Sequence, residues 1–316
     1  MTGYVTTAQG ERWQLPQLME WELEYTAGTP CDSFWLRCPF GGSNGADVRQ
    51  WSRFDAWEGG EQVFTGVVDE CRESLTRAGR MLELSGRGLA ALLLDNEALP
   101  QDYGTATLAD ILRDHVTPYG IRTAGAVSLP PVSPFSVSAG SSEWTVLHEF
   151  ARYYGGVAPR FDRAGRLVLS GWQDGQELLL GDGTPVTELV CVDKRYGVLS
   201  DVWVRDRYQN RVERVENSGF KARGGCARRV MTMPGRSSWQ AMRYTGQFQL
   251  DCSAAELLVV EAEIPALFYA WPGDLVRLER SGWDRNGLYR VVQSRVRLNE
   301  NGGSTRLELA DPERSV

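Results

Sequence analysis

VVDECRESLTRAGRMLELS (residues 67–85) and VVQSRVRLNENGGSTRLELA (residues 291–310) are the two stretches that decide the fold of this chain. Each begins with Val-Val, alternates along its length, passes through a turn that contains glycine, and returns through Leu-Glu-Leu. Alternation places every second side chain on one face of a sheet, and glycine supplies the positive φ that a short hairpin turn requires. Both stretches are therefore predicted to be β-hairpins. Either a duplicated β module or a chance similarity of two hairpins accounts for the pair.

The composition of the 316 residues is typical of a folded protein in water: 42% are hydrophobic, 10% aromatic and 24% charged. No stretch approaches the roughly 20 apolar residues of a membrane helix. The first residues, MTGYVTTAQGERWQ, have neither a basic start nor an apolar run. We therefore expect no membrane segment and no signal peptide. Six scattered cysteines without a C-x-x-C pair predict reduced thiols in a protein made in the cytoplasm.

The charge of the chain argues against a partner held through phosphate groups. The net charge is −7, so we expect no specific nucleic-acid binding. Of the 34 basic residues, only Lys194 and Lys221 are lysines. A GC-rich genome explains this arginine bias, and planar guanidinium groups at subunit interfaces are the alternative explanation.

The chain is predicted to be mainly β with a central α+β unit. Short strands separated by glycine-rich turns fill a first β domain at residues 1–88 and a second at 176–316, which has room for an inserted subdomain. Such strands predict an antiparallel barrel or sandwich in each. The middle domain, residues 89–175, carries the helices.

Three helices are predicted in the middle domain, at about 89–99, 106–116 and 142–154. Thr107 or Thr105 is expected to cap the second helix, and the Ser142-x-x-Thr145 spacing predicts the start of the third. In the last domain we expect a strand over 243–250 with a short helical turn at 251–256, and a mobile basic hairpin loop over 209–229.

Two motifs suggest cofactor or metal chemistry and fail on their context. Gly86-x-Gly88-x-x-Ala91 resembles a dinucleotide-binding turn, but a helix follows where a second strand is required. His148-Glu149 begins as H-E-x-x-H does, yet Arg152 occupies the second histidine position. The other histidine, His115, has no evident catalytic partners, so no cofactor and no metal is expected.

The acidic residues offer no catalytic pair that the sequence can identify. Asp69, Glu70 and Glu73 lie on one predicted strand, where solvated charge is the expected role. The chain is accordingly predicted not to be an enzyme. A cell-wall hydrolase attached to a tail and a carbohydrate-binding β module, the latter suggested by the 11 tryptophans, remain the alternatives.

Several stretches, in this order, resemble the hub proteins of phage tail baseplates, in the late-control and PBSX-like hub families of contractile tails. They are VFTGVVD (63–69), LELSGR (82–87), TLADILRDHVTPYGI (107–121), SEWTVLHEFARYYGGVAPRFDRAGRLVLSG (142–171) and WPGDLVRLERSGWDRNGLYRVVQSRVRLNENGGSTRLELADPE (271–313). Together they cover most of residues 60–175 and 270–312.

The resemblance implies a homotrimer in which each chain contributes two tail-tube-like barrels that flank or enclose the helix-containing domain. Three copies of two barrels form a pseudo-sixfold ring, which can join the sixfold tail tube to the threefold central spike. The implied partners are the tail tube protein, the spike protein and the baseplate wedge proteins. The implied location is the tail baseplate of a virion, after synthesis in the host cytoplasm.

In such a ring, the strands predicted at 48–57, 62–74, 274–280 and 287–298 are expected to carry contacts between subunits, since unpaired strand edges invite addition from another chain. The candidate interface residues on these strands are Arg53, Asp55, Glu70, Arg72, Arg277 and Arg295.

Overall fold

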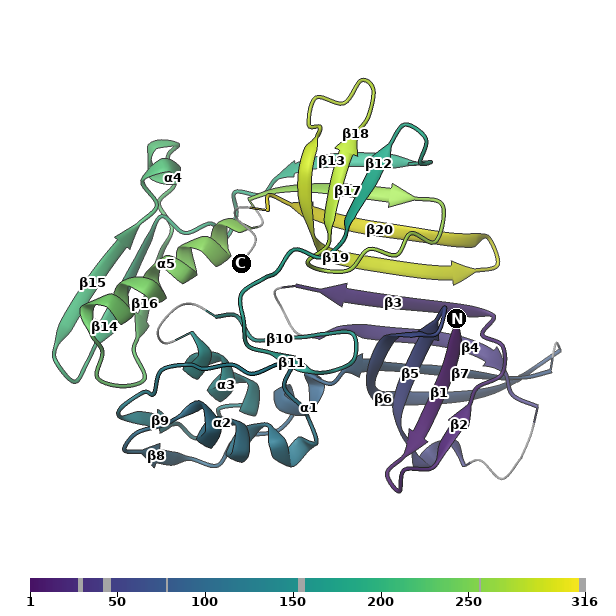
Figure 1. The fold of residues 1–316 in the computed structure, drawn as a ribbon, viewed down its shortest axis with the longest axis horizontal. Helices are drawn as coiled ribbons and strands as arrows, with labels where there is room; N and C mark the ends of the chain where they lie inside the picture. Colours follow the sequence, from purple (N-terminus) through teal and green to yellow (C-terminus); the bar gives the residue numbers. More distant parts are fainter. Residues whose placement is uncertain (28–30, 42–46, 78, 153–156, 256, 313–316) are drawn as a thin grey trace.

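The computed structural model describes residues 1–27, 31–41, 47–77, 79–152, 157–255 and 257–312 (Figure 1). The chain is mainly β, as predicted, with a few helices in a separate unit. A 13-stranded sheet runs through both ends of the chain, and smaller sheets belong to the helical unit. Figure 1 shows the two β regions one above the other, with the helix-containing part beside them.

The first β region forms because its apolar residues alternate. In β3, Trp21, Leu23 and Tyr25 are all buried, and they point to the same side of the sheet. Phe34 and Phe54 stack in this core with ring centroids 4.3 Å apart. The elements are β1 (Thr2–Thr7), β2 (Arg12–Gln14), β3 (Glu20–Thr26), β4 (Ser33–Pro39), η1 (Val48–Gln50), β5 (Trp51–Glu58), β6 (Glu61–Thr76) and β7 (Gly79–Gly88).

The second β region has its own core, which includes Val260, Val276, Val291 and Leu307. Its strands are β12 (Glu177–Gly181), β13 (Glu188–Asp193), β17 (Leu258–Ile264), β18 (Leu275–Glu279), β19 (Gly287–Asn299) and β20 (Gly302–Ala310).

The helical unit is assembled from two segments of the chain that share one core. Ile111 and Leu147 from the first segment belong to the same buried cluster as Val202 and Met242 from the second. The first segment contains α1 (Ala91–Leu94), β8 (Gln101–Tyr103), α2 (Leu108–His115), η2 (Thr117–Tyr119), β9 (Phe135–Val137), α3 (Glu143–Ala151), β10 (Arg160–Phe161) and β11 (Leu167–Val168). The second contains β14 (Asp201–Asp206), β15 (Arg211–Glu216), α4 (Ser218–Ala222), β16 (Arg228–Thr232) and α5 (Trp239–Ala255).

The two helix starts that the sequence signals are confirmed. Thr107 and Asp110 form a reciprocal capping box at α2, and the Ser142 hydroxyl accepts from the Thr145 N–H at 3.1 Å at α3. The helix predicted at 89–99 is shorter, because only Ala91–Leu94 is helical.

Two predictions for the last region are wrong. Residues 243–250 are part of α5, not a strand: Met242, Thr245 and Gln249 are buried at helical spacing, and α5 packs on β14 and β15. Residues 209–229 hold β15, α4 and the start of β16 instead of one hairpin loop. In both places tertiary packing overrides the local pattern.

The two β regions have the same strand order. In the first it is β3-β4-β7-β6-β5-β1, and in the second it is β13-β17-β20-β19-β18-β12. The outermost strand differs in direction, since β1 is antiparallel to β5 whereas β12 is parallel to β18. This shared order supports duplication of one β module over chance similarity of two hairpins.

Both predicted hairpins are confirmed, and each carries a β-bulge at the same place. The register of β6 with β7 shifts between Val68 and Glu70, and that of β19 with β20 shifts between Val291 and Gln293. Val68 is therefore the counterpart of Val291, and Leu84 of Leu307. The two Leu-Glu-Leu triplets are thus offset by two residues, although both belong to returning strands.

The glycines of the dinucleotide-like motif have a packing explanation. A Cβ atom on Gly86 would lie 1.9 Å from the Val67 carbonyl oxygen and 2.6 Å from Phe34 Cε1. One on Gly88 would lie 3.3 Å from the Asp32 side chain. Glycine is required here because two strands and an aromatic ring approach the backbone closely.

Replacing Gly86 with alanine should therefore destabilise the first β region. We expect Gly86→Ala to lower the free energy of unfolding by about 1–3 kcal/mol, because the backbone must shift to admit the methyl group. Chemical denaturation measures this. The control is Gly104→Ala, where no atom lies within 4 Å of the added Cβ. Equal stability of the two variants would contradict the packing explanation.

Candidate functional site: the junction of the two β regions

The two β regions are joined by direct pairing of β3 with β19. The strands are antiparallel, and their register runs from Gln293 opposite Thr26 to Leu298 opposite Trp21. This pairing makes one continuous sheet out of two regions that each have their own core. Figure 1 shows β3 and β19 side by side at the boundary. The junction holds the two regions together as one continuous sheet.

Charged side chains cross this junction on its outer face. Arg295 Nη2 lies 2.8 Å from Glu24 Oε2 and 2.9 Å from Glu24 Oε1. Arg295 Nε lies 3.8 Å from Glu22 Oε1. The hydrogen bond that Arg295 donates to Glu24 raises the pKa of the Arg295 guanidinium. Opposite charges on facing strands fix the register as well as adding stability.

The other face of the junction is apolar. Val296 lies opposite Leu23, and both are buried in the core of the first region. Leu298 packs against the same cluster opposite Trp21. A strand of the second region thus completes the core of the first, so separating the regions would expose apolar surface.

The six candidate interface residues do not form one cluster. Arg72, on β6, and Arg295, on β19, are counterparts in the two hairpins, and Arg72 pairs with Glu70 at 2.9 Å. Arg277, on β18, pairs with Glu177 at 2.6 Å. Asp55 on β5 accepts from the Thr65 hydroxyl at 2.6 Å, and Arg53 on the same strand lies opposite Val67. Most of these residues therefore have partners within the chain.

Three of the four strands expected to offer unpaired edges are paired on both sides. β5 lies between β1 and β6, β18 between β12 and β19, and β19 pairs with β20, β18 and β3. β6 is different. Its first half pairs with β5 only as far as Val67, so from Glu70 to Thr76 it pairs with β7 alone among the described residues. Among those same residues, β13 pairs only with β17.

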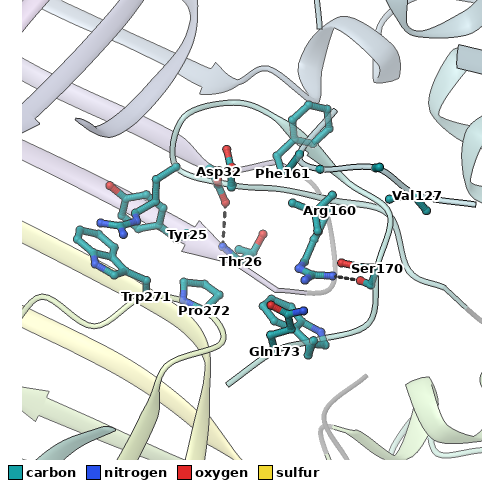
Figure 2. A pocket seen from close by; sticks show the side chains of 17 residues that line it. Tyr25, Thr26, Asp32, Val127, Arg160, Phe161, Ser170, Gln173, Trp271 and Pro272 are labelled. Atoms are coloured by element: carbon teal, nitrogen blue, oxygen red, sulfur yellow. Dashed lines mark hydrogen bonds between the residues drawn. The ribbon is translucent and has the colours of Figure 1, made fainter. Parts of the chain in front are cut away.

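A cavity of about 530 Å³ lies where the helical unit meets the two β regions (Figure 2). Tyr25 and Asp32 from the first region line it, with Trp271 from the second and Arg160 and Trp172 from the segment between. Sequence analysis did not single out these residues, since they lie far apart in the chain and match no motif.

The polar groups of this cavity are engaged with one another. Asp32 accepts from the Thr26 N–H at 2.9 Å, and Arg160 Nη1 donates to the Ser170 carbonyl at 2.6 Å (Figure 2). The Arg160 guanidinium also lies over the Trp172 ring, 4.1 Å from its centroid. Burial raises the pKa of Asp32 to about 7, more than the Thr26 hydrogen bond lowers it. The Trp271 ring meets the Tyr25 ring edge to face, with centroids 4.9 Å apart, and also lies under the Arg163 guanidinium, so it ties three parts of the chain together.

The histidines serve packing in this structure. His115 is buried, with Nδ1 2.6 Å from Glu143 Oε2 and Nε2 3.0 Å from the Tyr103 hydroxyl. The carboxylate of Glu143 also accepts from Tyr119 at 2.9 Å, so the network links α2, η2 and α3. Burial lowers the pKa of His148 to about 4. Neither His115 nor Glu143 lines the cavity at the junction of the three parts.

Among the described residues, no group of three or more histidine, cysteine or acidic side chains could hold a metal ion. Of the helices in the described part of the chain, none is long and apolar enough to cross a membrane.

Two solved structures of tail proteins share this fold over nearly their whole length. A tail protein from Neisseria meningitidis MC58 superposes with a TM-score of 0.78 at 18% identity, over 99% of this chain and 97% of that one. The 43 kDa tail protein of prophage MuSo2 from Shewanella oneidensis gives 0.76 at 16% identity, over the full length of both chains. The chain has the fold of phage tail proteins. The expected resemblance is confirmed at this level.

Similarity extends to secretion machinery. An E. coli component of the type VI secretion system, itself described as similar to the T4 tail proteins gp27 and gp5, gives a TM-score of 0.56 at 11% identity. It is covered over 74% of its length, and this chain over 94%. No protein-family model and no curated protein sequence matches the chain. The likeness is therefore one of fold, beyond the reach of sequence comparison.

The junction charges can be tested by exchange. Arg295→Glu should lower the free energy of unfolding by about 1–2 kcal/mol, because it removes a cross-strand pair and sets like charges against each other. Adding Glu24→Arg should recover part of this loss. Arg72→Glu, at the counterpart position on β6, is the control and should cost less. Independent, additive effects of the two exchanges would contradict the pairing.

The raised pKa of Asp32 predicts a dependence of stability on pH. The folded value of about 7 lies above the ordinary value near 3.9, so the folded chain binds more protons between these values. The contribution of Asp32 to stability is therefore lost as pH rises from about 4 to about 7. Asp32→Asn should show a smaller fall over this interval in denaturation curves. Parallel pH profiles of the two proteins would refute the assignment.

Proposed function

We propose that this protein is the structural baseplate hub of a phage tail or a related contractile injection particle. Three copies form a ring of six β regions, which joins the sixfold tail tube to the threefold central spike. The tail tube protein, the spike protein and the baseplate wedge proteins are its partners in the tail baseplate, after synthesis in the host cytoplasm. Its role is to match two symmetries and not to catalyse a reaction.

One observation carries the proposal: each chain holds two β regions of the same strand order, joined edge to edge through β3 and β19. A ring of three such chains presents six similar modules on one side while keeping threefold symmetry overall. The fold similarity to tail proteins over nearly the whole chain is consistent with this role. A single-module protein could not serve both symmetries in this way.

The described residues support the two alternatives less well. A cell-wall hydrolase needs an accessible acid or metal site, and the His115–Glu143 pair is buried. A carbohydrate-binding module needs exposed aromatic faces. In the central cavity, the Arg163 guanidinium lies 4.7 Å from the Trp271 ring centroid and covers it, as Arg160 covers Trp172.

The proposal is tested by mass. Light scattering of the purified protein should give three times the 35.2 kDa of one chain, and purified tail particles should contain three copies at the end of the tube. A single-chain mass at high concentration, together with its absence from tail particles, would refute the hub. A fall in turbidity of a peptidoglycan suspension would refute the non-enzymatic role.

A further inference from the structure

Among the described residues, two strand segments lack the partner strand that their counterparts have. β19 pairs with β18 before its bulge and with β3 after it. β6 pairs with β5 before its bulge, but in the described part of the chain its later half pairs with β7 alone. In the same way β3 has two neighbours, whereas its counterpart β13 has only β17 among the described strands. In the described part of the chain, β13 and the later half of β6 therefore each have one free edge, whereas their counterparts β3 and β19 pair with each other.

The two segments lie far apart in the strand order of the sheet. Six strands separate β13 from β6 in the sheet order, namely β17, β20, β19, β3, β4 and β7. Figure 1 shows β13 in the upper β region and β6 in the lower one. Among the described residues neither segment pairs with the other, so we look outside the chain for the partner of each. A second copy carries the complementary segment.

We propose that β13 of one copy pairs antiparallel with the later half of β6 of the next copy, repeating between chains the β3–β19 junction within the chain. The contact uses different strands on the two copies, so it propagates around a ring. The number of copies rests on the proposed function. The inference specifies the strands and their register.

The register follows from matching rows of residues across three neighbouring strands in the two regions. The row in the first region is Trp21–Leu36–Leu84, and the matching row in the second region is Leu189–Ala262–Leu307. Leu189 is thus the counterpart of Trp21, while Leu75 is the counterpart of Leu298 because both hairpins have the same length after the bulge. Transferring the β3–β19 register sets these residues opposite one another: Glu70–Lys194, Cys71–Asp193, Arg72–Val192, Glu73–Cys191, Ser74–Val190 and Leu75–Leu189.

Two of these pairs, Glu70–Lys194 and Leu75–Leu189, are complementary, whereas Glu73 takes the position that the buried Val296 has on β19. Glu70 faces Lys194, which have opposite charges, and none of the six pairs sets like charges directly against each other. Leu75 is 82% exposed in the single chain, although its counterpart Leu298 packs against a core. In the proposed contact Leu189 covers it. An exposed leucine on an open strand is thereby explained as part of an interface.

The surface beside β13 leaves room for a partner. A cavity of about 700 Å³ is lined by Leu189, Val190, Cys191 and Asp193, with Trp283 among the residues around it. Four of the six residues of this strand thus border open space. Such an accessible strand with apolar side chains is suited to accept main-chain hydrogen bonds from a second strand.

The bulge supports the same arrangement. Within the chain, the Ala27 N–H donates to the carbonyl of Val292, the bulged residue of β19, at 2.8 Å. Asp69 is the bulged residue of β6, and Arg195 is the counterpart of Ala27. The proposed contact thus extends one residue beyond the six pairs, with the Arg195 N–H donating to the Asp69 carbonyl.

Disulfide formation tests the strands and the register together. In the full-length protein, Ser74→Cys with Val190→Cys places two thiols directly opposite, within disulfide reach. Mild oxidation should give covalent dimers and trimers, and a reductant should return them to single chains by cleaving the disulfides. Arg297→Cys with Glu22→Cys is the matched control, because these positions face each other within one chain and should give a cross-linked monomer.

The register has its own control. Ser74→Cys with Val192→Cys sets the thiols on a diagonal about 7–8 Å apart, where cross-linking should be weak. The single variants Ser74→Cys and Val190→Cys retain the six native cysteines and report any background. Equal cross-linking of the direct and diagonal pairs would overturn the register.

Leu75→Asp provides a second measurement that needs no oxidation. It should raise the concentration required for assembly about tenfold or more, since an apolar contact is replaced by a charge. Its melting curve should match that of Leu99→Asp, a control at an 81% exposed leucine in the helical unit, which should assemble normally. Equal assembly of both variants would overturn the role of Leu75.

The outcomes separate this inference from the proposed function. A trimer that forms without the Ser74–Val190 cross-link, while the Arg297–Glu22 control links, would refute the strand pairing and leave the hub intact. A protein that stays monomeric, is missing from tail particles and shows only the internal cross-link would refute both.

Discussion

The pairing of β3 with β19 is the interaction on which the rest of the structure depends. It joins the first and last parts of the chain through main-chain hydrogen bonds, and Val296 from the second region fills the core of the first. Because both regions contribute to one core, they cannot rotate independently. The helical unit then packs beside this continuous sheet. Asp32 from the first region, Trp271 from the second and Arg160 from the segment between them line one cavity where the three parts meet.

Much of the β architecture could be predicted from the sequence, because alternation is a local signal. The hairpins at 67–85 and 291–310 are confirmed, as are the caps at Thr107 and Ser142. Residues 243–250 were misassigned since their burial has a period close to four, and this shows only when α5 is placed on its sheet. Glycine spacing at Gly86 suggested a ligand, whereas close strand packing explains it.

The junction was harder to predict than the elements that build it. Glu24 and Arg295 are 271 residues apart in sequence, and neither alternation nor spacing indicates that their strands meet. Arg72 and Arg295 were grouped as interface candidates, and they prove to be counterparts in a repeated module. One has its partner strand within the chain, and the other lies where the described residues provide none. Pairing of this kind is set by the topology of the whole sheet, which a local pattern cannot encode.

The counterpart strands β3 and β13 carry different outward side chains, and they therefore differ in how ionic strength affects them. On β3 the outward positions opposite β19 are Glu22 and Glu24, which meet Arg295, whereas the corresponding positions on β13 are Val190 and Val192. Added salt screens the exposed charges of the first set, whereas the two valines carry no charge that salt could screen. Ionic strength therefore weakens the seam between β3 and β19 at positions where β13 is insensitive to it, although the two strands hold the same place in their modules.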